Sequence, residues 1–435
     1  MTSKQDLLKH LCPLPSEIES RVTAGIEHNR KADCSLKLTT ADGTPMANAT
    51  VRIEQTSHDF LFGANSFMFG GHKAAEQNAQ WDQMYTDVFN STVVGLFWSS
   101  YEPQQGVYRY ETGSEPMYRR PPVDDVLNWC DKHNMVPKGH NLLWASKKQL
   151  PDWISALPET KIIDAIHKRF EMLGKLYDGR IPMLDVVNEL FCVPRETALP
   201  KNFATLAYKL ADEYFPNSQL FVNENTDASW MWGHREYSPY HLLMEHFRNQ
   251  GIKRIQGMGL QFHLFNHLHK ITPHIEHWLR PAMIMQQLDQ LATEKLPMHV
   301  SEITVGSSAV LSDTDGEFVQ AKLVRSLYRM WFSHPSVEAI YWWNLADGNA
   351  WGSEAAYLAG LLREDLSPKP AYDAVKSLIH EEWTTHITCK TDDTGCINFR
   401  GFKGKYSASC DQKQATFGVH GSSDNQQTTI ILQKS

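Results

Sequence analysis

The stretch Met183-Leu-Asp-Val-Val-Asn-Glu189 is an apolar, strand-like run that ends on a carboxylate, and Met298-His-Val-Ser-Glu302 repeats this arrangement later in the chain. A carboxyl group at the end of a buried strand is costly to desolvate, so its position there indicates a function. The two glutamates can meet only if the fold brings both strand ends together. A closed barrel of parallel strands does so, because it gathers the carboxyl ends of its strands on one face.

Along the rest of the chain, further strand-like runs alternate with helical segments. Strands are predicted at residues 60–64, 92–98, 136–143, 184–187, 220–223, 255–260, 298–303 and 339–344. Helical segments between them include residues 162–176, 240–248, 283–292 and 318–332. Eight strand–helix repeats indicate an α/β protein with a parallel sheet, which closes most simply into a (β/α)8 TIM barrel.

The two ends of the chain follow other patterns. Residues 4–30 are predicted to be helical, and the alternating runs 34–40 and 49–54 around a turn predict a β-hairpin. From about residue 383, short alternating runs with glycine predict a small β module that pairs with this hairpin. We therefore expect an N-terminal helix and hairpin (1–57), a catalytic barrel (58–382) and a C-terminal β module (383–435).

Composition narrows the class of protein. The chain has 435 residues, 42% hydrophobic and 21% charged, as in an ordinary soluble globular protein. Its net charge of −8 argues against nucleic acid or an anionic membrane as partner. No run of about 18 apolar residues predicts a membrane span. The first fifteen residues do not resemble a signal peptide. A cytoplasmic protein is expected, or an extracellular or periplasmic one if a leader was removed.

Seven cysteines are an odd number and are scattered along the chain. One disulfide is possible within the C-terminal group Cys389, Cys396 and Cys410. The other four are interpreted as isolated buried thiols: Cys12, Cys34, Cys130 and Cys192.

Two carboxylates facing each other across a barrel indicate glycoside hydrolysis, in which one group donates a proton and the other attacks the sugar or activates water. Seven runs then match one family in order and spacing. They are Gly139-His-Asn-Leu-Leu-Trp144, Leu150-Pro-Asp-Trp153, Asp185-Val-Val-Asn-Glu189, Gly259-Leu-Gln-Phe-His-Leu264, Val300-Ser-Glu-Ile303, Trp343-Asn-Leu-Ala-Asp347 with Trp351, and Pro368-Lys-Pro-Ala-Tyr372. Over roughly residues 58–380 the chain resembles glycoside hydrolase family 10, the endo-β-1,4-xylanase family.

The resemblance implies roles for particular residues. Glu189 would be the general acid/base and Glu302 the nucleophile of a retaining reaction. Asn188 would bind the 2-hydroxyl of the sugar, and His263, with Gln261 nearby, would hold the nucleophile. The remaining implied positions line the pocket or form its roof: His140, Trp144, Trp343 and Trp351. A β-linked polysaccharide or oligosaccharide is the implied partner, and no cofactor is expected.

The match fails after the second strand. Val93 and Val94 stand where the family has Glu and Asn, and Phe97 stands where it has Lys. Ala145 and Lys147 are further departures beside the pocket. Each lost hydrogen bond costs roughly 1 kcal/mol, and Phe97 would occupy part of the space. We therefore expect intact catalytic groups with a remodelled glycone side, and a substrate that is another β-glycan, a decorated oligosaccharide or a short glycoside cut from its end.

Two other classes of function remain open. One is a carbohydrate-binding barrel that has lost catalysis, which the presence of both glutamates disfavours. The other is a metal-dependent hydrolase, prompted by five histidines between residues 263 and 277. Catalytic zinc takes ligands from several strand ends, whereas these residues lie mostly in one loop, so no metal is expected. The five are His263, His267, His269, His274 and His277.

Overall fold

A computed structural model of the chain describes residues 8–9, 11–230, 235–264, 273–308, 313–420 and 428–434. Eight parallel strands form a closed barrel in which each strand pairs with the next and the last pairs with the first. In chain order they are β3 (Leu61–Asn65), β4 (Ser91–Gly95), β5 (Val136–Trp144), β6 (Met183–Asn188), β7 (Gln219–Glu224), β8 (Gly257–Leu264), β9 (Met298–Val305) and β10 (Val337–Trp342). The predicted (β/α)8 barrel is confirmed.

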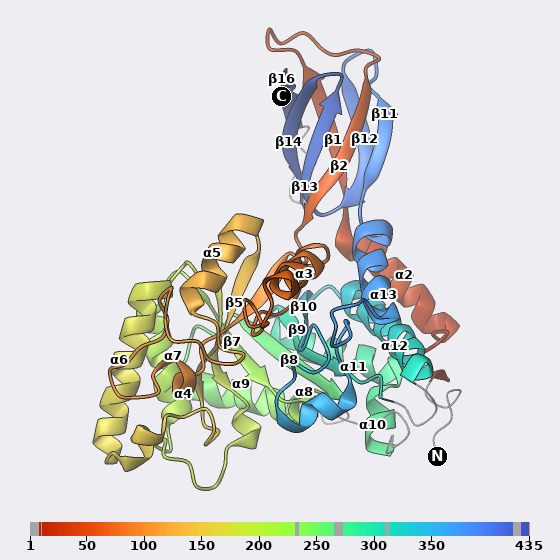
Figure 1. Cartoon of the computed structure of the whole chain (residues 1–435). Coiled ribbons are helices and arrows are strands. Elements are labelled where there is room, and N and C mark those ends of the chain that lie inside the picture. The colour runs from red at the N-terminus through yellow and green to blue at the C-terminus, as the bar shows by residue number, and fades with distance from the viewer. Residues whose placement is uncertain are drawn as a thin grey trace.

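A helix of 8 to 21 residues follows each strand and covers the outside of the barrel (Figure 1). These helices are α3 (Ala75–Thr86), α5 (Val123–His133), α6 (Glu159–Tyr177), α7 (Phe203–Tyr214), α9 (Pro239–Asn249), α11 (Pro281–Leu291), α12 (Asp313–Ser333) and α13 (Pro370–Ser377). Short helices interrupt the loops at the carboxyl ends of three strands: α4 (Trp98–Tyr101), α8 (Thr226–Trp230) and α10 (Pro273–Trp278). Trp98 was predicted to end a strand, but it begins α4.

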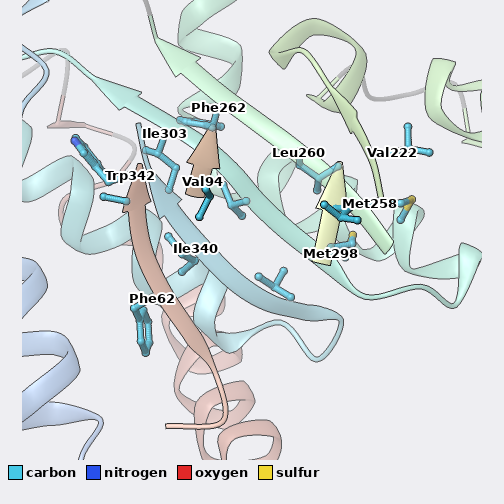
Figure 2. Packing of buried hydrophobic residues seen from close by; sticks show 14 of the residues in the cluster. Phe62, Val94, Val222, Met258, Leu260, Phe262, Met298, Ile303, Ile340 and Trp342 are labelled. Atoms are coloured by element: carbon cyan, nitrogen blue, oxygen red, sulfur yellow. The ribbon is translucent and has the colours of Figure 1, made fainter. Parts of the chain in front are cut away.

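The main core lies between the strands and the surrounding helices. Large apolar side chains on the outer face of the barrel fill this layer, among them Phe62, Leu260, Phe262, Ile340 and Trp342 (Figure 2). Because successive side chains of a strand point to opposite faces, the residues between them point into the barrel. That interior holds the buried side chains of Lys138, Asp185 and His299. Lys138 and His299 pack there against the rings of Phe221 and Tyr341.

The two ends of the chain together form a β sandwich. One sheet has the order β12-β1-β15 and the other β11-β2-β13-β14-β16. The strands are β1 (Lys31–Thr39), β2 (Thr50–His58), β11 (His386–Lys390), β12 (Cys396–Phe402), β13 (Gly404–Cys410), β14 (Lys413–Val419), β15 (Thr428–Ile431) and β16 (Gln433–Lys434). The predicted hairpin is wrong, since β1 and β2 lie in different sheets. Pairing of both strands with C-terminal strands is confirmed.

The sandwich joins the barrel at the amino ends of its strands (Figure 1). β2 ends at His58, shortly before β3 begins. The preceding helix is α2 (Ser16–Arg30). Residues 11–15 were predicted to be helical but are not, and residues 1–7 and 10 lie outside the described part. Arg30 at the end of α2 donates hydrogen bonds to the backbone carbonyls of Phe332, His334 and Val337 beside β10. These contacts tie the helix to the end of the barrel opposite the strand ends that carry the two glutamates.

No disulfide forms, so Cys389, Cys396 and Cys410 remain free thiols. Cys192, predicted to be buried, is exposed in the loop that follows Glu189. Within the described ranges, no helix combines the length and apolar content that a bilayer crossing requires.

Candidate active site

Glu189 lies directly after β6, at the carboxyl end of the barrel. Its backbone is left-handed (φ 54°, ψ 56°), and its N–H donates to the carbonyl of Asn223 on β7 over 2.9 Å. The carboxylate of Glu224 accepts hydrogen bonds from the next two backbone N–H groups, those of Leu190 at 2.7 Å and Phe191 at 3.4 Å. A non-glycine residue with positive φ is unfavourable unless its surroundings hold it. Glu224 therefore helps to fix the turn that directs Glu189.

Glu302 points into the barrel because β9 carries a bulge. Leu260 of β8 pairs with Val300, but the next residue, Gln261, pairs with Glu302, so Ser301 is the extra residue. With strict alternation, a side chain two residues after the outward-facing Val300 would also face the helices. The bulge instead turns Ser301 and Glu302 both inward. Ser301 donates to Oδ1 of Asn223 over 2.6 Å.

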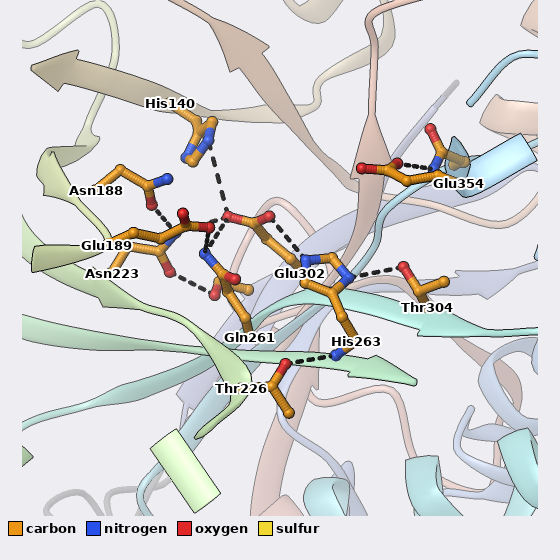
Figure 3. Close-up of polar contacts among 12 residues, drawn as sticks. His140, Asn188, Glu189, Asn223, Thr226, Gln261, His263, Glu302, Thr304 and Glu354 are labelled. Carbon is orange, nitrogen blue, oxygen red and sulfur yellow. Dashed lines mark hydrogen bonds and ion pairs between the residues drawn. The ribbon is translucent and has the colours of Figure 1, made fainter. Parts of the chain in front are cut away.

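One side-chain amide contacts both glutamates. Nε2 of Gln261 donates to Oε1 of Glu189 at 3.0 Å and to Oε1 of Glu302 at 3.1 Å (Figure 3). The two oxygens therefore lie no farther apart than two hydrogen bonds placed end to end. Retaining glycosidases hold their carboxyl groups about 5–5.5 Å apart, whereas inverting ones leave a wider gap for water. The arrangement fits direct attack by one carboxylate.

Glu302 receives more hydrogen bonds than Glu189. Nδ2 of Asn223 donates to its Oε1 over 2.7 Å, and Nε2 of His263 lies 3.1 Å from its Oε2. Burial lowers the pKa of His263 to about 4, so the ring is neutral near pH 7 and has a single N–H. Nδ1 of His263 lies 2.7 Å from the Thr304 hydroxyl. If that hydroxyl donates, the N–H is on Nε2 and points at the carboxylate of Glu302.

The ring of His140 is held by Asp185. Its Nδ1 lies 3.0 Å from Oδ2 of Asp185, whose other oxygen pairs with Nζ of Lys138 at 2.9 Å. Burial tends to raise the pKa of Asp185, but the charge of Lys138 and the contact with His140 outweigh it and lower that pKa. The ionised Asp185 thus orients His140 so that its Nε2 faces Glu302 at 3.8 Å.

Both glutamates have raised pKa values. Burial, followed by the charge of Glu302, raises the pKa of Glu189 to about 7. Burial also raises the pKa of Glu302 to about 7, against the opposing effects of His140 and the hydrogen bond from Asn223. Two such close carboxyls share a proton, and hydrogen bonds to the charged form favour ionisation. Because Glu302 has more donors, the shared proton resides mainly on Glu189.

The carboxylates open into a cavity of about 510 Å³. The sequence-predicted residues that line it are Glu189, Glu302, His140, Trp144, Gln261, His263, Trp343, Trp351 and Phe97. Asn188 is buried and is not among the lining residues; its Oδ1 accepts from Asn223 over 2.8 Å. Trp351 is 48% exposed and Trp343 only 8%, so Trp351 offers the more open aromatic face.

The aromatic wall beside His140 contains Phe97. Its ring centre lies 5.5 Å from that of His140, and the Trp343 ring centre lies 5.3 Å from that of His140. Phe67, Val93 and Phe97 belong to one buried cluster with Trp343. Two positions where the sequence departs from the family, Val93 and Phe97, therefore belong to an apolar wall next to the carboxylates, and Phe97 lines the cavity itself. Val94, the third, packs in the main core instead.

Four functional neighbours were missed by reasoning from the sequence. Asn223 and Glu224 end β7. The position of this strand was predicted, but not the role of its last two residues. A polar Asn-Glu pair at the end of an apolar strand could have identified them as site residues. Arg119 and Arg120 line the cavity from a loop after β4, and no periodicity in the sequence marks them.

The histidines considered as metal ligands do not assemble around His263 in the described part of the chain. Across the described residues, no three His, Cys, Asp or Glu side chains form a group able to hold a metal ion. His267, His269 and the side chain of His274 lie outside the part of the chain that the structure describes.

A parallel barrel with two facing carboxylates at its carboxyl end defines the glycoside hydrolase class of site. The family model for glycosyl hydrolase family 10 matches residues 61–378. The chain belongs to this family.

Among curated proteins, the chain is 26% identical over 388 residues to the anti-sigma-I factor RsgI6 of Acetivibrio thermocellus, covering 88% of this chain and 45% of that protein. It is 24% identical to endo-1,4-beta-xylanase 2 of Arabidopsis thaliana, covering 87% of this chain and 32% of the relative. The chain thus spans less than half the length of these two relatives.

Solved structures show the same fold. Xylanase 10B from Thermotoga petrophila, in complex with xylobiose, superposes with a TM-score of 0.59 at 19% identity, covering 74% of this chain and 95% of that one. A GH10 endoxylanase from a sugarcane soil metagenome gives a TM-score of 0.57 at 21% identity, covering 74% and 97%.

Proposed function

We propose that this chain is a retaining β-glycoside hydrolase of xylanase type, which cleaves β-1,4-linked xylan or a related β-glycan or oligosaccharide by double displacement. The bridge that Gln261 makes between Glu189 and Glu302 carries the proposal, because it keeps two of their oxygens within two hydrogen-bond lengths of each other, which leaves less room than the gap that an inverting mechanism needs for water. Membership of glycosyl hydrolase family 10 supports the same reaction.

In the first step, an oxygen of Glu302 attacks the anomeric carbon while the glycosidic C–O bond breaks. Glu189 transfers its proton to the leaving oxygen, so the aglycone departs as a neutral alcohol. The raised pKa of Glu189 keeps this proton available near neutral pH. Asn223, His263 and Gln261 hold Glu302 in the orientation for attack.

In the second step, the ionised Glu189 removes a proton from water, and the resulting hydroxide attacks the anomeric carbon from the aglycone side. The ester bond to Glu302 breaks, and the sugar leaves with its original configuration. The charge of the new Glu302 carboxylate is again met by the donors around it. Asn188, beneath the cavity, is proposed to contact the 2-hydroxyl once the sugar is bound.

The apolar wall favours a second candidate within the same chemistry, an exo-acting or aglycone-releasing enzyme on a non-xylan substrate. Phe97 and Val93 are buried where the family pattern has polar side chains. The wall supplies no side-chain hydrogen-bond donor at these positions. A substrate that binds there is therefore expected to differ from a plain xylose chain.

The β sandwich contributes none of the described residues that line the cavity. We propose that residues 1–57 and 383–435 act together as one supporting module and that 58–382 is the catalytic domain. The attachment of the sandwich at the amino ends of the barrel strands supports this division.

Hydrolysis of an aryl β-xyloside and an aryl β-glucoside tests the proposal. Wild type, Glu302→Ala, Glu189→Ala and the surface control Glu245→Ala are compared. We expect Glu302→Ala to lose at least about a thousandfold in kcat, and Glu245→Ala to match wild type. An unchanged rate in Glu302→Ala would favour a carbohydrate-binding barrel. Sizing the products from a panel of β-glycans then separates endo from exo action.

A further inference from the structure

Two buried arginines lie in the cavity wall next to Phe97. Arg119 and Arg120 come from the loop between α4 and α5 and are only 3% and 7% exposed. Both line the same cavity as the two glutamates. The guanidinium carbon of Arg120 lies 4.0 Å from the centre of the Phe97 ring and 5.6 Å from that of Trp351. The pair therefore sits on the apolar wall where the sequence departs from its family.

Neither guanidinium has a carboxylate partner at ion-pair distance among the described residues. Arg120 donates to the Ser100 hydroxyl at 3.3 Å and to the Arg119 carbonyl at 2.8 Å. Nε of Arg119 is buried without any hydrogen-bond partner in the part of the chain that the structure describes. The charge of Glu354 acts on Arg119, but the Glu354 carboxylate contacts the amide of Asn344 instead.

Other buried arginines of the barrel are satisfied. Arg169, which is 1% exposed, donates to the carbonyls of Leu142 and Leu96 and to the Tyr110 hydroxyl. A buried charge without such partners costs several kcal/mol. Arg119 bears this cost at the edge of a cavity, where an incoming group can reach it.

The chemistry of a guanidinium defines what fits. Its planar fork binds carboxylates and sulfate-like oxyanions through two parallel hydrogen bonds. The protein as a whole carries a net charge of −8, and the cavity holds Glu189, Glu302 and Glu354. An acidic glycan would be repelled unless a local positive group received its anion.

We propose that Arg119, supported by Arg120, forms an anion subsite on the glycone side of the cavity, so that the substrate is a β-glycan bearing a carboxylate or a sulfate ester. This inference rests on the proposed glycosidase function. The sugar bearing the anion stacks on the exposed face of Trp351, and its anionic group accepts hydrogen bonds from the Arg119 guanidinium. Phe97 and Val93 stand where the family pattern has polar side chains, so they remove hydrogen bonds that a neutral xylose chain would need there.

The test compares kcat/KM for three sets of oligosaccharides of equal length: undecorated xylooligosaccharides, xylooligosaccharides carrying a glucuronate branch, and sulfated xylooligosaccharides. We expect an acidic set to be cleaved at least about tenfold better than the neutral one. In Arg119→Gln the ratio of acidic to neutral kcat/KM falls to about one. Arg52→Gln, which removes an exposed arginine of the β sandwich, keeps the wild-type ratio.

The three substrate sets also identify the anionic group. A preference for glucuronate alone assigns a carboxylate, and a preference for sulfated substrates alone assigns a sulfate ester. Equal kcat/KM values for acidic and neutral sets, or a preference that survives in Arg119→Gln, would overturn the anion subsite.

Two measurements on wild type keep the test independent of folding and of catalysis. Raising NaCl from 20 to 200 mM should reduce the preference for acidic substrates, since screening weakens a charge interaction; a preference insensitive to salt contradicts the subsite. If the wild-type protein hydrolyses none of the oligosaccharides, the proposed glycosidase function is wrong, but the anion subsite is still tested. Calorimetric titration with the same oligosaccharides shows whether the acidic ones bind more tightly.

Discussion

The carboxylate of Glu224 accepts a hydrogen bond from the backbone N–H of Leu190 at 2.7 Å, one residue after Glu189. Burial raises the pKa of Glu224 to about 8 despite this bond, so the carboxyl is mostly protonated at pH 7 and still accepts through its carbonyl oxygen. Its position fixes the left-handed turn at Glu189 and thereby the direction of the acid side chain. Glu224 is thus a positioning residue rather than a catalytic one.

Glu224→Ala should weaken acid catalysis selectively. We expect kcat/KM to fall about tenfold to a hundredfold for substrates with poor leaving groups, which need the proton of Glu189, and much less for a dinitrophenyl glycoside, which does not. Glu224→Gln, which keeps one acceptor, should recover part of the loss. A loss of equal size for all leaving groups would show that the role of Glu224 is general stability.

A second prediction concerns Gly259 on β8. A Cβ at this position would lie 2.1 Å from Oδ1 of Asn223, so glycine gives Asn223 the space to reach Glu302. Gly259→Ala should therefore displace Asn223 and lower kcat by at least about tenfold.

Gly257→Ala is the matched control, because its Cβ would lie 2.0 Å from the Phe221 ring, deeper in the barrel. Both variants should lose thermal stability, but only Gly259→Ala should lose kcat beyond the loss of folded protein. Equal kcat losses would contradict the role given to Asn223.

The third prediction concerns the pH dependence of activity. The reactive form has Glu302 ionised and Glu189 protonated. Activity falls as pH drops and Glu302 takes up a proton, and it falls as pH rises and Glu189 loses its proton. Because burial raises both pKa values to about 7, kcat/KM should show a narrow maximum near neutral pH. The alkaline limb should disappear with a dinitrophenyl glycoside; an alkaline limb that persists would assign it to another group.

The fourth prediction links the pKa of Glu302 to stability. The pKa rises from 4.5 to about 7 on folding, so the folded state prefers the protonated form. The stabilisation that Glu302 contributes is fully present below pH 4.5 and is lost as pH rises through about 7, an effect on the order of 3 kcal/mol. Glutamine does not titrate.

The difference in melting temperature between Glu302→Gln and wild type should therefore shift by several degrees in favour of the variant from pH 5 to pH 8. Because the comparison is made between two pH values, any effect of the substitution on melting temperature that does not depend on pH cancels. A difference that is the same at both values would contradict the raised pKa.

The sequence predicted the barrel because apolar, strand-like runs alternate with helical segments eight times along the chain. The family resemblance also implied that His263 and Gln261 lie beside the nucleophile, and both contact Glu302 in the structure. Pairing partners were less predictable. An alternating run identifies a strand but not its neighbour, so β1 and β2 were wrongly joined in a hairpin.

The parts of the site that escaped prediction depend on long-range contacts. The bulge at Ser301 is invisible in a strand read by strict alternation, yet it turns Glu302 inward. The burial of Arg119 and Arg120 depends on how a long loop folds over Phe67 and Phe97. Charged residues in a loop are normally exposed, and nothing local in the sequence marks these two as exceptions.

The stereochemistry of the first product tests the central claim most directly. Proton NMR of an aryl β-xyloside digest, recorded before mutarotation, reports the configuration at the anomeric carbon. The bridged pair Glu189 and Glu302 predicts that the β-anomer appears first. Initial formation of the α-anomer would contradict attack by Glu302 and the double displacement built on it.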